Sequence, residues 1–243
     1  MKKIKVITRV LIIVVLVFIL AYKAYVKIGH RTMESLQVKG VDVSSYQGEI
    51  DWETLAGEDI DFAFIKATEG RSFKDRFFEE NIENIKETDL AAGAYHFLSF
   101  ESDGKSQAEN FISSVEKESI ELPPVIDLEL YGDYSKNPPP TAKVRKILDE
   151  MIKELYVEYG KYPIIYTNRR AYLLYVSGEY NECDLWICDI IKRPSLPDGR
   201  VWKFWQYSHT EKLPGYSGEE EYIDMNVFYG SKKEFLRYLK GEK

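Results

Sequence analysis

Short apolar runs alternate with longer polar, amphipathic segments along most of the chain. The apolar runs are rich in β-branched and aromatic residues, which is typical of buried strands. Eight strands are predicted on this basis, at Gly40–Ser44, Phe62–Ala67, Ala92–Phe97, Val125–Leu130, Ile164–Thr167, Leu185–Cys188, Trp202–Tyr207 and Ile223–Phe228.

Helical patterns separate the first five of these strands, and the clearest are Asp75–Glu87, Lys105–Glu118 and Thr141–Tyr159, with Thr141 as the expected N-cap. The last three strands are joined by proline-containing loops instead. Alternation of strand and helix favours a parallel sheet. We therefore predict an α/β fold, a modified TIM-like (β/α) barrel with eight strands and helices missing in the last third. No low-complexity linker divides it, so residues 39–243 are expected to form one barrel domain.

Residues 10–26 form a membrane-directed segment with a single charge, Lys23. As a helix, these residues span about 25 Å, just short of a hydrocarbon core of about 30 Å unless the flanking Arg9 and Lys23 snorkel. An uncleaved anchor and a cleavable signal peptide both remain open. The residues after the apolar run lack the spaced small residues of a cleavage site, and Tyr22 and Tyr25 resemble interfacial anchors, which favours the uncleaved anchor.

The charge of the chain is divided unevenly. Residues 1–30 carry six basic residues and no acid, and removing these six from the 33 basic residues leaves 27 against 40 acidic ones, a net charge of −13 for residues 31–243. The basic start is expected in the cytoplasm, followed by the membrane segment, a short linker at 31–38 and an exported catalytic domain, which is secreted if the segment is cleaved. An acidic body repels nucleic acid, so no nucleic-acid partner is expected.

Three histidines and two cysteines are too scattered for a zinc site of ordinary ligand spacing, so no metal and no cofactor is expected, although an all-carboxylate metal site stays open. Cys183 and Cys188 flank a predicted strand and would stand about 16 Å apart, beyond disulfide reach, so two buried thiols are expected. His96, alone on a strand, is interpreted as a hydrogen-bonded structural group in preference to a proton donor.

Carboxylates gather at the ends of the predicted strands, where a parallel barrel presents its catalytic groups. These acids are Asp42, Glu69, Asp127, Glu129, Asp189 and Asp224. Asp127 and Glu129 lie two residues apart in an otherwise apolar strand, so they share one face. Facing the helices would bury two unpaired like charges, so we expect both at the barrel mouth. Neighbouring carboxylates raise each other's proton affinity, and a partly desolvated one can hold its proton near neutral pH and act as a general acid. The alternative is a structural ion pair with Lys66 as partner.

Aromatic and amide side chains, which suit sugar rings, accompany these acids, although each aromatic could equally belong to the core. They are Tyr46, Gln47, Tyr95, Phe97, Tyr166, Asn168, Trp186, Trp202, Phe204, Trp205, Gln206 and Tyr207. In the seventh strand Trp202 and Phe204 are expected on one face and Trp205 and Tyr207 on the other, so that only one pair lines the interior.

Six motifs in order resemble the glycoside hydrolase family 25 lysozymes over about residues 39–229. They are Val41-Asp42-Val43-Ser44-Ser45-Tyr46-Gln47-Gly48, Phe64-Ile65-Lys66-Ala67-Thr68-Glu69-Gly70, Gly93-Ala94-Tyr95-His96-Phe97, Val125-Ile126-Asp127-Leu128-Glu129, Trp205-Gln206-Tyr207 and Ile223-Asp224-Met225-Asn226. The resemblance implies a modified β/α barrel that hydrolyses the β-1,4 bond between N-acetylmuramic acid and N-acetylglucosamine in peptidoglycan, whose glycan strands are the expected partner of a monomer.

Carried over to this sequence, the family's proton donor is Glu129 and its other acids are Asp42, Asp127 and Asp224. Its sugar-contacting residues correspond to Tyr46, Tyr95, Tyr166 and Trp205, with Gln206 nearby. The sequence departs from the family pattern at Cys188-Asp189-Ile190, where a small residue and soon a tyrosine are common. Asp127 could assist by orienting the substrate's 2-acetamido group for attack, with retention, or Asp224 could activate a water, with inversion. The rival hypothesis is a catalytically silent glycan-binding module on the same barrel. A polysaccharide deacetylase would need a metal cluster that the histidines do not supply.

Overall fold

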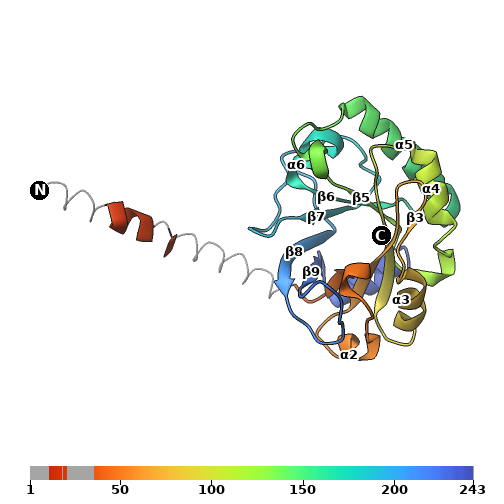
Figure 1. Cartoon of the computed structure of the whole chain (residues 1–243), viewed down its shortest axis with the longest axis horizontal. Coiled ribbons are helices and arrows are strands. Elements are labelled where there is room, and N and C mark those ends of the chain that lie inside the picture. The colour runs from red at the N-terminus through yellow and green to blue at the C-terminus, as the bar shows by residue number, and fades with distance from the viewer. Residues whose placement is uncertain (1–10, 18, 21–35, 243) are drawn as a thin grey trace, which may run out of the picture.

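The computed structural model describes residues 11–17, 19–20 and 36–242 (Figure 1). Residues 11–17 and 19–20 are helical. Within the described residues, no helix is both long enough and apolar enough to span a membrane. The predicted basic start and most of the linker lie outside the described residues, and so do residue 10, residue 18 and residues 21–26 of the predicted membrane segment.

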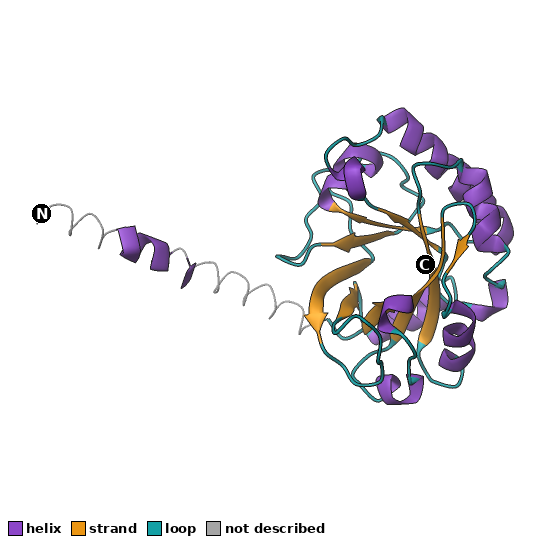
Figure 2. Cartoon of the chain, viewed as in Figure 1, coloured by secondary structure: helices purple, strands orange, loops and turns teal. Residues whose placement is uncertain are grey.

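One sheet holds every strand of the described part. Its strands are β1 (Lys39–Val43), β2 (Phe62–Glu69), β3 (Phe73–Lys74), β4 (Ala91–Phe97), β5 (Val125–Leu128), β6 (Ile164–Asn168), β7 (Leu185–Cys188), β8 (Phe204–Glu211) and β9 (Ile223–Phe228). The order is β1-β9-β8-β7-β6-β5-β4-β2-β3, and β1 also pairs with β2. That last pairing closes eight strands into a barrel, with β3 as a short antiparallel addition to β2. The predicted eight-stranded α/β barrel is confirmed, and Figure 2 shows helices around the outside of the strands.

β9 runs against its neighbours. All other barrel pairs are parallel, whereas β9 is antiparallel to both β8 and β1. Asp42, near the end of β1, consequently stands opposite Asp224, near the start of β9. The reversal brings a carboxylate from the beginning of one strand to the rim formed by the ends of the others.

Helices cover the barrel mainly along its first two thirds. They are α2 (Trp52–Ala56), α3 (Phe78–Ile85), α4 (Gly104–Ile112), α5 (Thr141–Tyr159), α6 (Arg169–Ala171) and α7 (Lys232–Leu239), with short turns η1 (Ser45–Gln47), η2 (Lys117–Ser119), η3 (Gly132–Ser135) and η4 (Tyr172–Val176). In the described chain no helix joins β7 to β8 or β8 to β9, as predicted for the last third. The exception to this prediction is α7, which follows β9. The expected cap was wrong by one residue: Pro140 is the N-cap of α5, and the Thr141 hydroxyl donates to the Leu174 carbonyl.

Two apolar clusters fill the structure. The outer cluster joins one face of the strands to the covering helices. The inner cluster includes Phe62, Phe64 and Phe204, which belong to strands, and Phe235 of α7. Alternation explains the division on β8, because Phe204 points inward and Trp205 outward. Trp202 packs in the outer cluster with Trp205, so its predicted sharing of a face with Phe204 is wrong: the strand begins only at Phe204.

Candidate active site

A cavity of about 650 Å³ opens at the rim where the parallel strands end. Eight of the nine residues predicted from the sequence line it, namely Asp42, Tyr46, Tyr95, Asp127, Glu129, Tyr166, Gln206 and Asp224. Its other lining residues are Val43, Ser44, Gln47, Lys66, Phe97, Trp186, His209, Thr210, Glu220 and Tyr222. The barrel thus collects the four predicted acids in one aromatic-walled space.

Trp205 is the predicted site residue that lies outside this cavity. It is fully buried in the outer cluster, packs against Trp202 and Tyr207, and donates its indole N–H to the Asp189 carbonyl at 2.8 Å. Its neighbour Gln206 faces the cavity, and adjacent residues of a strand cannot share a face. On β7, Trp186 supplies an indole to the cavity lining.

Two amides hold the Asp42–Asp224 pair. Gln206 Nε2 donates to Asp42 Oδ2 and to Asp224 Oδ2, each at 2.9 Å. Asn226 Nδ2 donates to the same oxygen of Asp42 at 2.8 Å. The amide hydrogens therefore stabilise both aspartates in fixed positions across the β1–β9 pair.

Two aromatic residues in turn orient these amides. The Tyr166 hydroxyl donates to Gln206 Oε1 at 2.8 Å, and the Trp186 indole N–H donates to Asn226 Oδ1 at 2.8 Å. An indole N–H only donates, so Asn226 must present its oxygen to Trp186 and its NH₂ to Asp42. Tyr166 and Trp186 thus fix the direction of the hydrogen bonds that Gln206 and Asn226 donate to Asp42.

Asp127 and Glu129 of the β5 segment both line the cavity, as their shared face predicted. Asp127 is buried, and its Oδ1 has no hydrogen-bond partner among the described residues. Glu129 accepts a long hydrogen bond of 3.5 Å from Asn168 Nδ2. The structural alternative, an ion pair to Lys66, is not what the structure contains: Lys66 Nζ pairs with Glu69 at 2.8 Å instead.

Burial is the main cause of the proton affinity of these acids. It raises the pKa of Asp127 well above its usual range, and the charge of Glu129 adds to the effect while Lys66 opposes it. It also raises the pKa of Glu129, against the hydrogen bond from Asn168. Desolvation raises the pKa of Asp42 to about 6 and that of Asp224 to about 8. Of the two causes expected from the sequence, neighbouring charges and partial desolvation, loss of water is the larger for all four acids.

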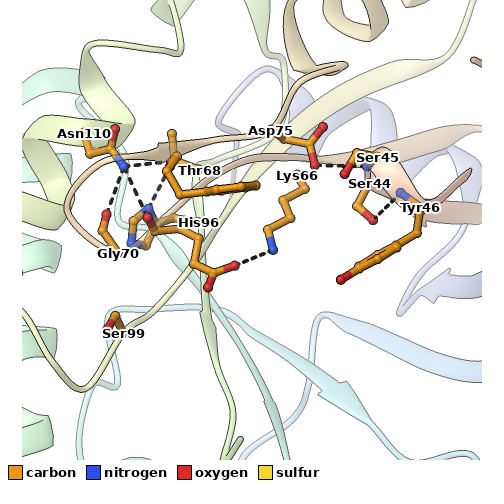
Figure 3. A network of polar contacts seen from close by, with 12 residues as sticks. Ser44, Ser45, Tyr46, Lys66, Thr68, Gly70, Asp75, His96, Ser99 and Asn110 are labelled. Carbon is orange, nitrogen blue, oxygen red and sulfur yellow. Dashed lines mark hydrogen bonds and ion pairs between the residues drawn. The ribbon is translucent and has the colours of Figure 1, made fainter. Parts of the chain in front are cut away.

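His96 has the structural role expected of it. It is fully buried, with Nδ1 2.7 Å from the Thr68 hydroxyl and Nε2 3.1 Å from Gln107 Oε1. Burial lowers the pKa of His96 to about 4, so the ring is neutral at physiological pH. Figure 3 shows it beside Thr68, away from Tyr46.

The two thiols and the two remaining predicted rim acids, Glu69 and Asp189, take no part in the cavity lining. Cys183 is buried in the outer cluster, whereas Cys188 is only half-buried, and both are free thiols. Desolvation raises the pKa of each thiol to about 12. Asp189 accepts the backbone N–H groups of Ile191 and Lys192 in a turn. No group of three or more potential metal ligands is found among the described residues.

Sequence reasoning missed the wall contributed by residues 209–222. β8 extends to Glu211, four residues beyond its predicted end, and carries His209 and Thr210 to the cavity. Glu220 and Tyr222 follow from the connection to β9. This stretch is polar and lacks apolar alternation, so no signal in the sequence marked it as part of a strand.

An acid pair with raised pKa values, set among aromatic rings at the carboxyl rim of a β/α barrel, defines a carboxylate-dependent glycoside hydrolase. The sequence model of the glycosyl hydrolases family 25 matches residues 41–216. This chain belongs to that family, as the motifs predicted.

Individual relatives agree with this assignment. A family 25 glycosyl hydrolase from Bacillus anthracis is 50% identical, with a TM-score of 0.78 over 82% of this chain and 92% of that chain. A bacterial lysozyme from Streptomyces coelicolor is 29% identical, with a TM-score of 0.76 over 86% of this chain and 100% of that chain. Lysozyme M1 from Streptomyces globisporus is 31% identical over 216 residues, which cover 82% of this chain and 70% of its own length.

Proposed function

We propose that this enzyme is an N-acetylmuramidase that cleaves the β-1,4 bond between N-acetylmuramic acid and N-acetylglucosamine in peptidoglycan. Lysozyme M1 and the Streptomyces coelicolor lysozyme support this substrate class by their names. The observation that carries the proposal is the position of Glu129, whose half-buried side chain lines an aromatic-walled cavity together with Asp127. Desolvation raises the pKa of Glu129, which favours the protonated carboxyl that a general acid needs for the glycosidic oxygen.

Asp127 assists in this proposal by accepting a hydrogen bond from the substrate. Its Oδ1 is buried and has no partner in the part of the chain that the structure describes, which is costly unless a ligand supplies the donor. The N–H of a 2-acetamido group is such a donor, and the hydrogen bond would turn the acetamido carbonyl toward the anomeric carbon. This route retains the anomeric configuration, whereas activation of a water by Asp224 would invert it. The anomer released first, followed by NMR, distinguishes the two.

Asp42 and Asp224 are proposed as further catalytic acids, with Tyr46, Tyr95, Tyr166 and Gln206 as substrate-binding residues. Trp205 does not touch the cavity and is proposed only as a packing residue for the β8 wall. The alternative function, a catalytically silent glycan-binding module, has no use for a buried proton donor. The presence of four acids in one cavity therefore favours catalysis.

We further propose that the catalytic domain acts outside the cytoplasmic membrane as a monomer on glycan strands. The apolar segment 10–26 and the basic residues before it support export and anchoring. The net negative charge of residues 31–243 repels nucleic acid and therefore suits another kind of partner.

The deciding experiment replaces Glu129 with glutamine. The amide has the shape of the acid and keeps its hydrogen-bonding capacity, but it cannot donate the required proton. We expect at least a hundredfold loss of muropeptide release from purified peptidoglycan, measured by mass spectrometry after borohydride reduction. Glu109→Gln, on the exposed face of α4, is the matched control and should retain full activity. Activity of Glu129→Gln within tenfold of wild type would eliminate Glu129 as the acid. Absence of release by the wild type would favour the binding module.

A further inference from the structure

Two loops that are far apart in sequence form one wall of the cavity. The first follows β1 and carries Tyr46, and the second connects β8 to β9 and carries Tyr222. Both tyrosines are exposed at the cavity, to 61% and 39% respectively. No hydrogen bond to the Tyr46 hydroxyl and no aromatic partner of its ring occurs in the described structure, so the backbone beneath it must set its position.

Main-chain hydrogen bonds join the two loops. Gly218 N–H donates to the Gln47 carbonyl at 2.8 Å, and Glu220 N–H donates to the Tyr46 carbonyl at 3.0 Å. Asp51 N–H donates in the opposite direction, to the Gly215 carbonyl at 2.7 Å. On either side of the turn after Tyr46, backbone groups of the first loop are thus hydrogen-bonded to the second loop.

Two facing glycines permit this approach. A Cβ on Gly218 would lie 2.1 Å from the Tyr46 carbonyl oxygen, and one on Gly48 would lie 2.7 Å from Gly218 Cα. The obstacles are backbone atoms, which cannot rotate away as a side chain would. Gly48 also has a φ of +69°, a conformation that side chains disfavour. Any larger residue at Gly218 forces the loops apart and moves the backbone that bears Tyr46.

The other flank of the first loop is fixed independently. Asp75 Oδ2 accepts the Ser45 N–H at 3.0 Å, and Figure 3 shows this contact beside Tyr46. Its second oxygen, Oδ1, accepts the Phe77 N–H at 3.0 Å, so Asp75 itself is held in place. A displacement at Gly218 therefore shifts Tyr46 relative to Ser45, which Asp75 holds in place. It leaves the carboxylates on β1, β5 and β9 where they are.

We propose that the Gly48–Gly218 contact is a positioning device that sets the separation of Tyr46 and Tyr222 and thereby the affinity for a sugar ring between them. Gly218 acts through these tyrosines and touches no substrate. The inference rests on the proposed glycan hydrolysis, and it assigns the 212–222 connection to recognition of the substrate.

The test compares Gly218→Ala with Glu219→Ala, an exposed neighbour that does not line the cavity. On soluble peptidoglycan glycan fragments we expect the first variant to raise KM about tenfold with kcat within threefold of wild type, and the second to change neither. A fall in kcat at unchanged KM, or no change in KM, would overturn the inference. A wild type that cleaves no fragment would refute the proposed function instead.

A second comparison keeps the inference testable if Gly218→Ala unfolds. Tyr222→Ala truncates a side chain at the surface, and calorimetric titration of the same fragments into its Glu129→Gln form measures binding without hydrolysis. We expect about tenfold weaker binding than in Glu129→Gln alone, and an unchanged dissociation constant would refute the role of this wall. If Gly218→Ala folds, adding Tyr222→Ala to it should weaken binding less than twofold further, because Gly218→Ala has already displaced Tyr46 and Tyr222 from each other. A full additive loss would show that the glycine contact does not position Tyr222.

Discussion

Replacing Asp224 with asparagine should stabilise the fold while lowering activity. Asparagine has the same shape, and its oxygen can still accept the hydrogen that Gln206 Nε2 donates at 2.9 Å. The substitution removes a desolvated carboxylate. Burial raises the pKa of this carboxylate to about 8. A folded-state pKa above the unfolded value of about 3.9 means that the native protein binds the proton more tightly than the unfolded chain does. The stability that this proton contributes is therefore present at low pH and is lost as the pH rises from about 4 through about 8.

The size of the effect follows from the same shift. At pH 7 Asp224 is ionised in the unfolded chain but still mostly protonated in the fold, and this difference lowers the free energy of unfolding by about 4 kcal/mol relative to an uncharged side chain. Asp42 stands opposite on β1 and shares the charge, so we expect Asp224→Asn to recover about 2 to 4 kcal/mol at pH 7. For a domain of this size that corresponds to a melting temperature about 5 to 10 °C higher.

Urea unfolding of both proteins at several pH values between 4 and 8 measures the difference directly. The stabilisation should grow with pH and be small at pH 4, where Asp224 is protonated in the fold and about half protonated in the unfolded chain. Asp133→Asn, an exposed acid outside the cavity, is the control and should show no such trend. An Asp224→Asn protein that is no more stable than wild type at pH 8, or a gain independent of pH, would refute the reasoning that its burial costs stability.

Two further predictions concern pH and location. The kcat/KM profile should be bell-shaped with a mildly acidic optimum, because activity falls as Glu129 loses its proton at high pH and as the coupled carboxylates of the cavity gain protons as a group at low pH; a flat profile from pH 5 to 9 would exclude a carboxylic acid as proton donor. The full chain should fractionate with membranes at full mass and resist carbonate washing, whereas a mature N-terminus near Ala24 or Lys27 would establish cleavage of a signal peptide.

Alternation within a strand was the part of the sequence that located the site most reliably. It placed Asp127 and Glu129 on one face because β5 is regular and otherwise apolar. The same rule places Gln206 and Trp205 on opposite faces of β8, so only one of these two neighbours lines the cavity. Contacts between distant segments could not be predicted from the sequence. Neither the reversal of β9, which brings Asp224 to the rim, nor the close approach of Gly48 and Gly218 is marked by a pattern in the neighbouring residues.

The reversal of β9 also sets where the two ends of the described fold lie relative to the cavity. Because β9 starts at the rim and runs away from it, the chain leaves the barrel at the far end, where Phe228 N–H donates to the Val38 carbonyl just before β1. α7 then places Phe235 against the inner cluster at that end. Entry and exit of the described fold thus share the side opposite the cavity. A tag, carrier domain or surface linkage joined at either terminus would leave the mouth unobstructed, and an immobilised enzyme would present its mouth outward toward a bulky polymer.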